Sequence, residues 1–163
     1  MKQQIRLSNG AIIEIKDTPF ASGGEADIFE ISNPNSYSQQ VLKVYKSDKR
    51  TQSKEKKLKF LIDNKPNLAS NNGHHSVIWP THIAYDSNKF LGYTMPRATG
   101  VKLELLCHSK LPKHLSNEWH KFSFETPGVI DKRLKLCFNI SAALSQIHSF
   151  GSYVLVDMKP DNV

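Results

Sequence analysis

Residues 153–163 read Tyr-Val-Leu-Val-Asp-Met-Lys-Pro-Asp-Asn-Val, an apolar run followed by a polar turn. β-Branched and aromatic residues favour extended backbone, and Pro160 prevents an immediate helix. We therefore expect a strand that delivers Asp157, Lys159 and Asn162 into one loop. A carboxylate can accept a proton from a hydroxyl, an ammonium group can hold a phosphoryl group, and an amide can bind magnesium. The alternative is a polar turn after a strand with no catalytic role.

The composition is that of one ordinary globular domain or of two small lobes. Of the 163 residues, 39% are hydrophobic, and no apolar run is long enough to span a bilayer. The N-terminal residues lack the apolar core of a secretory signal. Cys107 and Cys137 form neither a metal-binding spacing nor a disulfide framework. We therefore expect a cytoplasmic protein with no membrane partner.

Much of the net charge of +7 comes from the lysine-rich residues 43–65. A basic segment of this size can bind a polyanion, although a solvated helix surface is the more common explanation. Aromatic residues do not interleave with the lysines, so no stacking platform for single-stranded nucleic acid is expected. A polyanion-binding module stays open as a third function, and nucleic acid is not the expected partner.

The N-terminal part of the chain is predicted to form strands. Residues 3–7 and 11–15 flank an Asn-Gly pair, which favours a hairpin turn. Gly23 and Gly24 lie between two further β-like runs. Glycine lets the backbone approach a ligand closely, although a plain flexible turn explains the pair equally well.

A strand is predicted over residues 40–46, with Lys43 on the same face as Val41 and Tyr45. A lysine inside an apolar strand is unfavourable unless it is paired, although edge strands also carry such lysines. The next predicted element is a helix over residues 51–63, with Glu55 on its apolar face. Glu55 is a candidate partner for Lys43, and the alternative is an ordinary surface glutamate.

The remaining elements complete an α+β lobe and begin a second region. We expect strands over residues 77–85 and 90–95, a surface insertion over residues 107–128, and a long amphipathic helix over residues 131–149. The helix leads into the loop that contains Asp157.

This order of elements resembles the protein-kinase superfamily. The motif Asp157-Met158-Lys159-Pro160-Asp161-Asn162 is similar to the Asp-x-Lys-Pro-x-Asn part of that family's catalytic loop. Residues 23–25, 77–81 and 92–97 look more narrowly like a group of bacterial kinase-like proteins. In some members of that group, a helix-hairpin-helix module follows the kinase domain.

The resemblance implies a kinase-like fold of class α+β. Residues 1–97 would form a five-stranded antiparallel small lobe with one helix. Residues 98–163 would form the hinge, the insertion, the long helix and the catalytic loop, which begin a helical large lobe. The implied function is ATP-dependent transfer of the γ-phosphate to a protein Ser or Thr hydroxyl, with ATP and Mg²⁺ as cofactors.

The resemblance also assigns roles to individual residues. Asp157 would be the catalytic base, Lys159 would contact the phosphate, and Asn162 would be a magnesium ligand. The glycine loop that contacts the nucleotide would correspond to Gly23, Gly24, Ala26 and Ile28. The strand lysine would be Lys43, and its helix partner would be Glu55. Thr94 would be the gatekeeper, and Met95 and Arg97 would belong to the hinge.

Two departures limit what the resemblance implies. Leu155 and Val156 replace the family's usual His and Arg, and the sequence contains no Asp-Phe-Gly-like segment after residue 163. We therefore expect an N-terminal fragment that does not transfer phosphate by itself. Its long helix is expected to pack against a missing lobe, a second copy or another protein. A pseudokinase or scaffold that binds nucleotide or a partner without turnover is the alternative.

Overall fold

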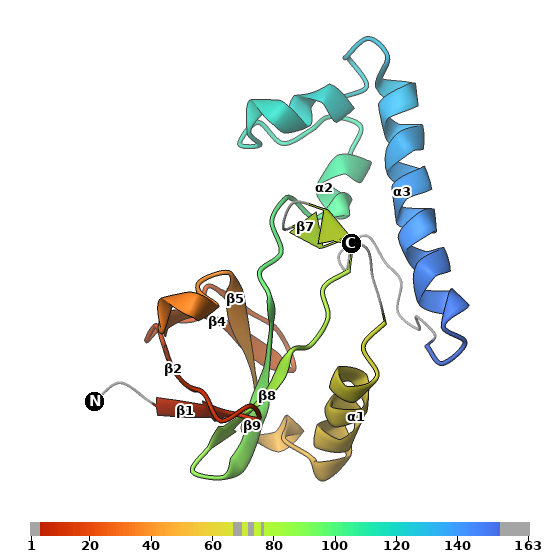
Figure 1. Ribbon diagram of the computed structural model, residues 1–163. Coiled ribbons are helices and arrows are strands. Elements are labelled where there is room, and N and C mark those ends of the chain that lie inside the picture. The colour runs from red at the N-terminus through yellow and green to blue at the C-terminus, as the bar shows by residue number, and fades with distance from the viewer. Residues whose placement is uncertain (1–3, 67–69, 72–73, 76, 154–163) are drawn as a thin grey trace. The chain divides into compact units, whose positions relative to one another are not determined.

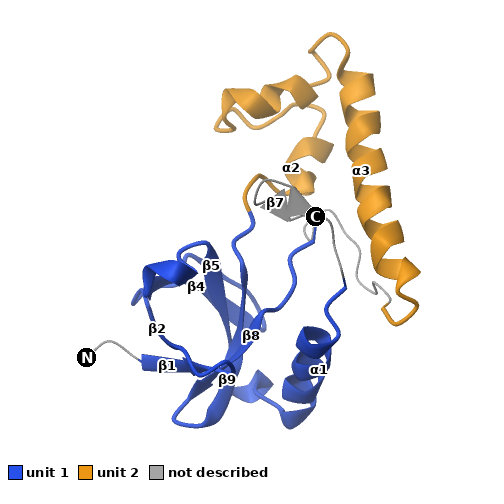
Figure 2. Ribbon diagram, in the orientation of Figure 1, with its two compact units in different colours: residues 1–98 blue, residues 99–163 orange. Residues whose placement is uncertain are grey.

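The computed structural model describes residues 4–66, 70–71, 74–75 and 77–153. The chain divides into two compact units, residues 1–98 and residues 99–163, and each is described by itself (Figure 2). The catalytic-loop motif of residues 157–162 lies outside the described residues.

The first unit is built on a closed antiparallel sheet (Figure 1). The strands follow the order β2-β1-β8-β9-β5-β4, and β4 pairs back onto β2, which closes a six-stranded barrel. The short strand β3 pairs with β4 outside this ring. The ring strands and β3 are β1 (Gln4–Leu7), β2 (Ile12–Ile15), β3 (Ala21–Ser22), β4 (Ala26–Asn33), β5 (Gln40–Tyr45), β8 (His82–Asp86) and β9 (Lys89–Pro96).

The predicted fold class, a five-stranded kinase-like small lobe followed by the beginning of a helical large lobe, is wrong. The finding that overturns it is the position of β1. This strand pairs with β2 on one side and with β8 on the other, where Arg6 lies opposite Tyr85 and Leu7 opposite Ala84. The two edges that an open lobe would expose are therefore joined, and backbone groups that would face solvent are paired.

Closure follows from how the strands bury their apolar residues. Side chains alternate across a strand, so Ile5 and Leu7 share one face of β1, and both are fully buried inside the barrel. Ile13 and Leu42 meet them there from β2 and β5. Each such side chain contributes roughly 1.5–3 kcal/mol on leaving water.

Helix α1 (Gln52–Asp63) packs on the outer face of the barrel. It begins after Thr51, whose hydroxyl oxygen accepts a hydrogen bond from the Lys54 backbone N–H at 3.2 Å, as an N-cap residue does. Leu58 is buried with Tyr45 and Ile83 beneath the helix. The predicted helix boundary at residue 51 is thus correct to within one residue.

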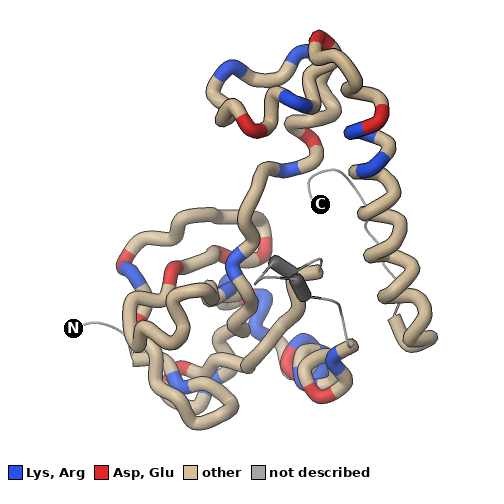
Figure 3. Tube along the Cα trace, turned by 45° about the horizontal axis from the view of Figure 1, so that its top comes forward, with Lys and Arg blue, Asp and Glu red and all other residues tan. Residues whose placement is uncertain are grey.

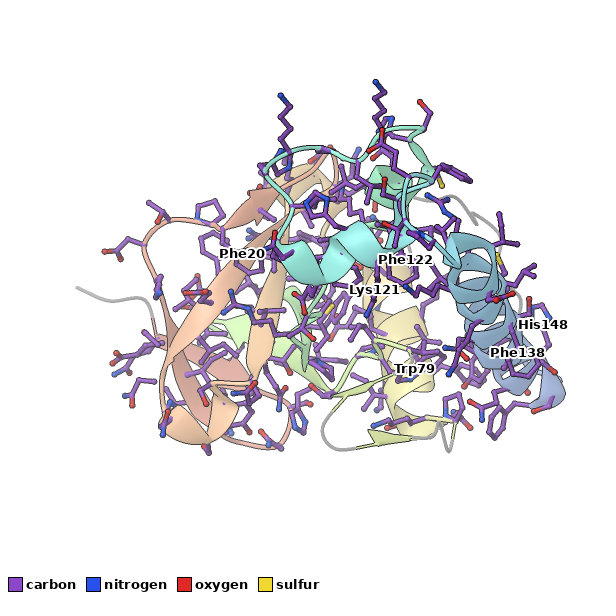
Figure 4. All side chains as sticks on the ribbon, turned by 90° about the horizontal axis from the view of Figure 1, so that it is seen from above. Phe20, Trp79, Lys121, Phe122, Phe138 and His148 are labelled. Atoms are coloured by element: carbon purple, nitrogen blue, oxygen red, sulfur yellow. The ribbon has the colours of Figure 1, made fainter. Side chains whose placement is uncertain are left out.

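Residues 77–80 are not a strand, although one was predicted there. The reason is Trp79, which lies beside α1 (Figure 4), where its indole N–H donates a 2.8 Å hydrogen bond to the carbonyl of Leu61. The side chain fills space against the helix instead of the sheet. Two further pieces, β6 (Ser70–Asn71) and β7 (His74–His75), form a separate two-stranded pair. Two 3₁₀ turns, Asn35–Tyr37 and Ser47–Lys49, complete this unit.

The second unit contains α2 (Leu103–Cys107), a 3₁₀ helix (Asn117–Phe122) and α3 (Val129–Ser149) among its described residues. Trp119 stacks on buried Phe122. The Arg133 guanidinium of α3 donates to the Phe122 carbonyl at 2.7 and 3.0 Å and lies 3.9 Å from the Phe124 ring. α3 begins two residues before the predicted start at residue 131, because Gly128 turns the chain at a φ of 70°.

One side of α3 exposes a row of apolar side chains. Ile130, Leu134 and Phe138 are spaced four residues apart and are 58%, 62% and 71% exposed. No helix in the described part of the chain has the length and apolar character required to cross a membrane.

Replacing Gly92 with alanine should destabilise the barrel strongly. A Cβ at this position would lie 1.9 Å from the carbonyl oxygen of Lys43 on the neighbouring strand. Relieving that clash requires β5 and β9 to separate, so we expect Gly92→Ala to lower the free energy of unfolding by about 3 kcal/mol in a urea titration.

Gly24→Ala is the matched control, because no atom lies within 4 Å of its added Cβ. The unfolding free energy of this variant should stay within about 1 kcal/mol of the wild-type value. Equal stability of the two variants would contradict the close approach of β5 and β9 at Gly92.

Candidate functional site around Lys43

Lys43 lies on the outer face of the barrel, on the same side as α1. It projects from β5 between Ile28 of β4 and Tyr93 of β9, which are its partners in the two neighbouring strands. The alternation predicted for this strand is confirmed: Leu42 and Val44 pack into the barrel interior, whereas Tyr45 belongs to the cluster beneath α1. Lys43 therefore sits at the border between a packed apolar surface and solvent.

Two ammonium groups approach one aromatic ring at this site. The Lys43 Nζ is 6.0 Å from the centroid of the Tyr45 ring, and the Lys54 Nζ of α1 is 4.7 Å from the same centroid. Lys43 also lies 5.8 Å from the centroid of Tyr93. Cation–π attraction at such distances offsets part of the repulsion between two nearby cations. We call Lys43, Lys54, Tyr45 and Tyr93 the lysine–tyrosine site.

The turn between β3 and β4 adds an anion and exposed backbone to this site. Gly23 and Gly24 are exposed, and the Gly23 N–H donates to the Ala26 carbonyl at 2.9 Å. The Glu25 carboxylate that follows them accepts a 3.0 Å hydrogen bond from the Lys54 ammonium. This bond lowers the pKa of Glu25, and the charges of Lys54 and Lys43 lower it further. The turn and the two lysines thus form one connected group.

The site carries a net positive charge. Burial raises the pKa of Tyr93 and of Tyr45, so both hydroxyls stay protonated at neutral pH. The tyrosines therefore do not neutralise the lysines, and among the described residues the carboxylate that pairs with this site is Glu25, which is bonded to Lys54. An added anion would find a favourable potential here.

The sequence suggested that Glu55 pairs with Lys43, but the structure shows no such pair. Its Oε1 instead accepts a 2.9 Å hydrogen bond from the hydroxyl of Tyr85 on β8. Within the described ranges of the chain, Lys43 makes no ion pair at all. The side chain of Lys43 is directed toward tyrosine rings, and the carboxylate predicted as its partner is held by Tyr85 of β8.

The remaining predicted nucleotide contacts are divided between the two faces of the barrel. Ile28 and Met95 lie on the Lys43 face of β4 and β9. Ala26 is buried in the cluster beneath α1. Thr94 is fully buried, and its Oγ1 lies 2.7 Å from the hydroxyl of Thr81. Because Thr94 follows Tyr93 along the strand, its side chain is directed away from Lys43, so the structure does not bring it to this site.

Arg97 follows β9 and is tied to a different carboxylate. Its Nη1 donates to Glu30 at 2.7 Å, and its guanidinium carbon lies 5.3 Å from the centroid of the exposed Phe20 ring, which Figure 4 labels. Its backbone N–H donates to the Gln39 carbonyl at 2.9 Å. These contacts hold the end of β9 against β4 and β5.

The predicted catalytic and metal-binding residues Asp157, Lys159 and Asn162 lie outside the described residues. Among the residues that the structure does describe, no group of three or more His, Cys, Asp or Glu side chains could hold a metal ion.

Comparison with protein-family models, with curated proteins and with solved structures yields no match for this chain.

Sequence reasoning missed the pairing of Glu25 with Lys54. Residues 43–65 contain many lysines, and the helix pattern alone does not select which ammonium group reaches the barrel. A usable signal was Thr51, a residue type favoured at helix N-caps. It places Lys54 in the first turn of α1, the end of the helix nearest the turn that carries Glu25.

Substituting Lys54 with methionine should raise the pKa of Glu25. The Lys54 hydrogen bond is the largest cause of the low pKa, so its removal should move the pKa up toward the ordinary value of 4.5. An NMR titration of the Glu25 side-chain carbonyl carbon measures this change.

Lys56→Met is the control, since Lys56 is an exposed lysine of the same helix that does not contact Glu25. If Lys56→Met and Lys54→Met raised the pKa of Glu25 equally, the hydrogen bond would not be its cause.

Proposed function

We propose that this chain binds the phosphate groups of ATP at the lysine–tyrosine site, as part of a protein Ser/Thr kinase-like function. The observation that carries the proposal is the convergence of Lys43 and Lys54 on Tyr45 beside the Gly23-Gly24 turn. Two ammonium groups and exposed glycine backbone are the groups that commonly hold phosphates. The Glu25 carboxylate bound to Lys54 indicates that an anionic oxygen fits at this place.

The proposed chemistry rests on the sequence motif that follows α3. Asp157 would accept the proton of a protein hydroxyl, and Lys159 would neutralise the transferring phosphate. Mg²⁺, held in part by Asn162, would supply further neutralisation of charge on the phosphates. The barrel fold differs from the expected kinase lobe, so the support for phosphotransfer is this motif together with the two lysines and the glycine turn beside Tyr45.

Nucleotide or partner binding without turnover is the second candidate. The observation that favours it is the hydrogen bond between Tyr85 and Glu55, which leaves Lys43 without the carboxylate partner that the resemblance implies. Leu155 and Val156, in place of the family's usual residues, point the same way.

A polyanion-binding module is the third candidate. Lys56, Lys57 and Lys59 are exposed along α1, and Figure 3 marks the basic residues on this helix. Such a surface would bind any polyanion with an affinity that falls steeply with salt.

The setting of the proposed function is the cytosol, with a protein as substrate or partner. Both cysteines, Cys107 and Cys137, are exposed and free, which fits a reducing compartment. The exposed row of Ile130, Leu134 and Phe138 on α3 is the surface at which a protein partner would pack.

Replacing Lys43 with methionine should weaken the binding of MgATP at least tenfold, which isothermal titration calorimetry of residues 1–163 would measure. Methionine keeps the apolar stem beside the tyrosines and removes the charge. Glu25→Gln should strengthen binding a few-fold, because the carboxylate competes with phosphate for Lys54.

Lys59→Met is the matched control, since Lys59 is an exposed lysine of α1 without a contact to the site. Equal losses in Lys43→Met and Lys59→Met, with a steep salt dependence, would favour the polyanion module. Absence of MgATP binding to the wild-type chain would overturn the proposal.

Turnover is tested separately in a phosphate-transfer assay. Asp157→Asn should abolish transfer while leaving the MgATP affinity within about twofold, because the base acts on the acceptor hydroxyl and not on nucleotide binding. Binding of MgATP without detectable transfer by the wild-type protein would favour the scaffold.

A further inference from the structure

A cavity of about 370 Å³ opens at one end of the barrel, on the interior side of the sheet and therefore away from the lysine–tyrosine site. Its volume falls within the range of small-ligand sites, roughly 300–1,000 Å³. Seven residues line it, which are Ile15, Lys16, Asp17, Phe29, Val44, Arg50 and Leu91.

Four of the seven side chains that line this barrel-end cavity are apolar, and the other three are charged. Ile15 closes β2, Val44 lies near the end of β5, and Leu91 lies near the start of the antiparallel strand β9, so all three mark the same end of the barrel. Phe29 joins them from β4. All four belong to the interior cluster or pack against it. A ligand here would place an apolar group against the top of the barrel core.

The rim of the cavity carries two opposite charges, Arg50 and Asp17, and neither forms an ion pair within the described part of the chain. Arg50 donates its Nε–H to the Tyr45 carbonyl at 2.8 Å, which fixes the guanidinium while its Nη groups make no hydrogen bond to a described residue. Asp17 likewise has no ion-pair or hydrogen-bond partner among them. Lys16 differs, because its ammonium is paired with Glu30.

We propose that the barrel-end cavity is a binding site for a free amino acid with an apolar side chain. The guanidinium of Arg50 would hold the α-carboxylate through its Nη groups, and the Asp17 carboxylate would accept hydrogen bonds from the α-ammonium. The side chain would occupy the space between Phe29, Val44 and Leu91. This inference is independent of ATP binding, since none of the residues of the lysine–tyrosine site lines the cavity.

The charge arrangement selects an amino acid over simpler amphiphiles. An apolar carboxylate would satisfy Arg50 and place a second anion beside Asp17. An apolar amine would satisfy Asp17 and place a second cation beside Arg50. A zwitterion pairs both groups at once, and the four apolar lining side chains favour a ligand with an apolar side chain over glycine.

An NMR titration of the wild-type chain with L-phenylalanine and with L-leucine tests the proposal. We expect saturable shifts of the backbone amides of Phe29, Val44 and Leu91. The affinity for 3-phenylpropionate, for 2-phenylethylamine and for glycine should be at least tenfold lower, because each lacks one of the three groups that the cavity recognises. Equal affinity for 3-phenylpropionate and L-phenylalanine would overturn the amino-acid assignment.

Variants at the rim provide the second arm of the test. Asp17→Asn, at an exposed position that should not disturb folding, and Arg50→Gln should each weaken L-phenylalanine binding at least tenfold. Asp63→Asn and Lys59→Gln, at exposed positions on α1, should leave it unchanged. Unaltered affinity in Asp17→Asn, or no saturable shift in the wild-type chain at up to about 10 mM ligand, would overturn the site.

Discussion

The backbone pairing of β1 with β8 is the constraint on which the first unit depends. It joins residues near the N-terminus to residues almost 80 positions later, with Arg6 opposite Tyr85 and Leu7 opposite Ala84. Without this pairing, the sheet would have two open edges and its apolar interior would face water on one side. With it, Ile5 and Leu7 complete the core, and the outer face becomes free to carry α1 and charged groups.

The same strand therefore serves the core and the candidate site. In β5, Leu42 and Val44 face inward, while Lys43 and Tyr45 face the helix. Each inward residue sets the orientation of its outward neighbour, so a well-packed interior holds Lys43 in a defined direction. The close approach of β5 to β9 at Gly92 strengthens this coupling, because it brings Tyr93 next to the lysine.

Local patterns in the sequence predicted local structure well. The Asn9-Gly10 pair lies between β1 and β2 as expected, and the face shared by Val41, Lys43 and Tyr45 follows from simple alternation. The closure of the barrel could not be predicted in this way, because β1 carries the same pattern whether its second edge is paired or open. Only the three-dimensional arrangement shows which distant strand satisfies that edge.

The candidate site was predictable to a similar degree. Lys43 and the glycine turn were found because each breaks an apolar pattern. The partner predicted for Lys43, Glu55, was wrong. Glu55 has the helical spacing expected of such a partner, but in the structure its carboxylate accepts a hydrogen bond from Tyr85. Charged side chains are long, and spacing along a helix restricts their reach too little to choose a partner.

Barrel closure by the first strand also has a consequence for synthesis of the protein. The ribosome releases β1 early, but its partner β8 follows about 75 residues later, after β5 and α1. Until residues 82–96 have emerged, the nascent chain has an unpaired strand edge and an incomplete apolar core, so it is exposed to misassociation during that interval. The slow step in the folding of this domain is then the pairing of β1 with β8. This contact is long-range in sequence, so local propensities do not accelerate it.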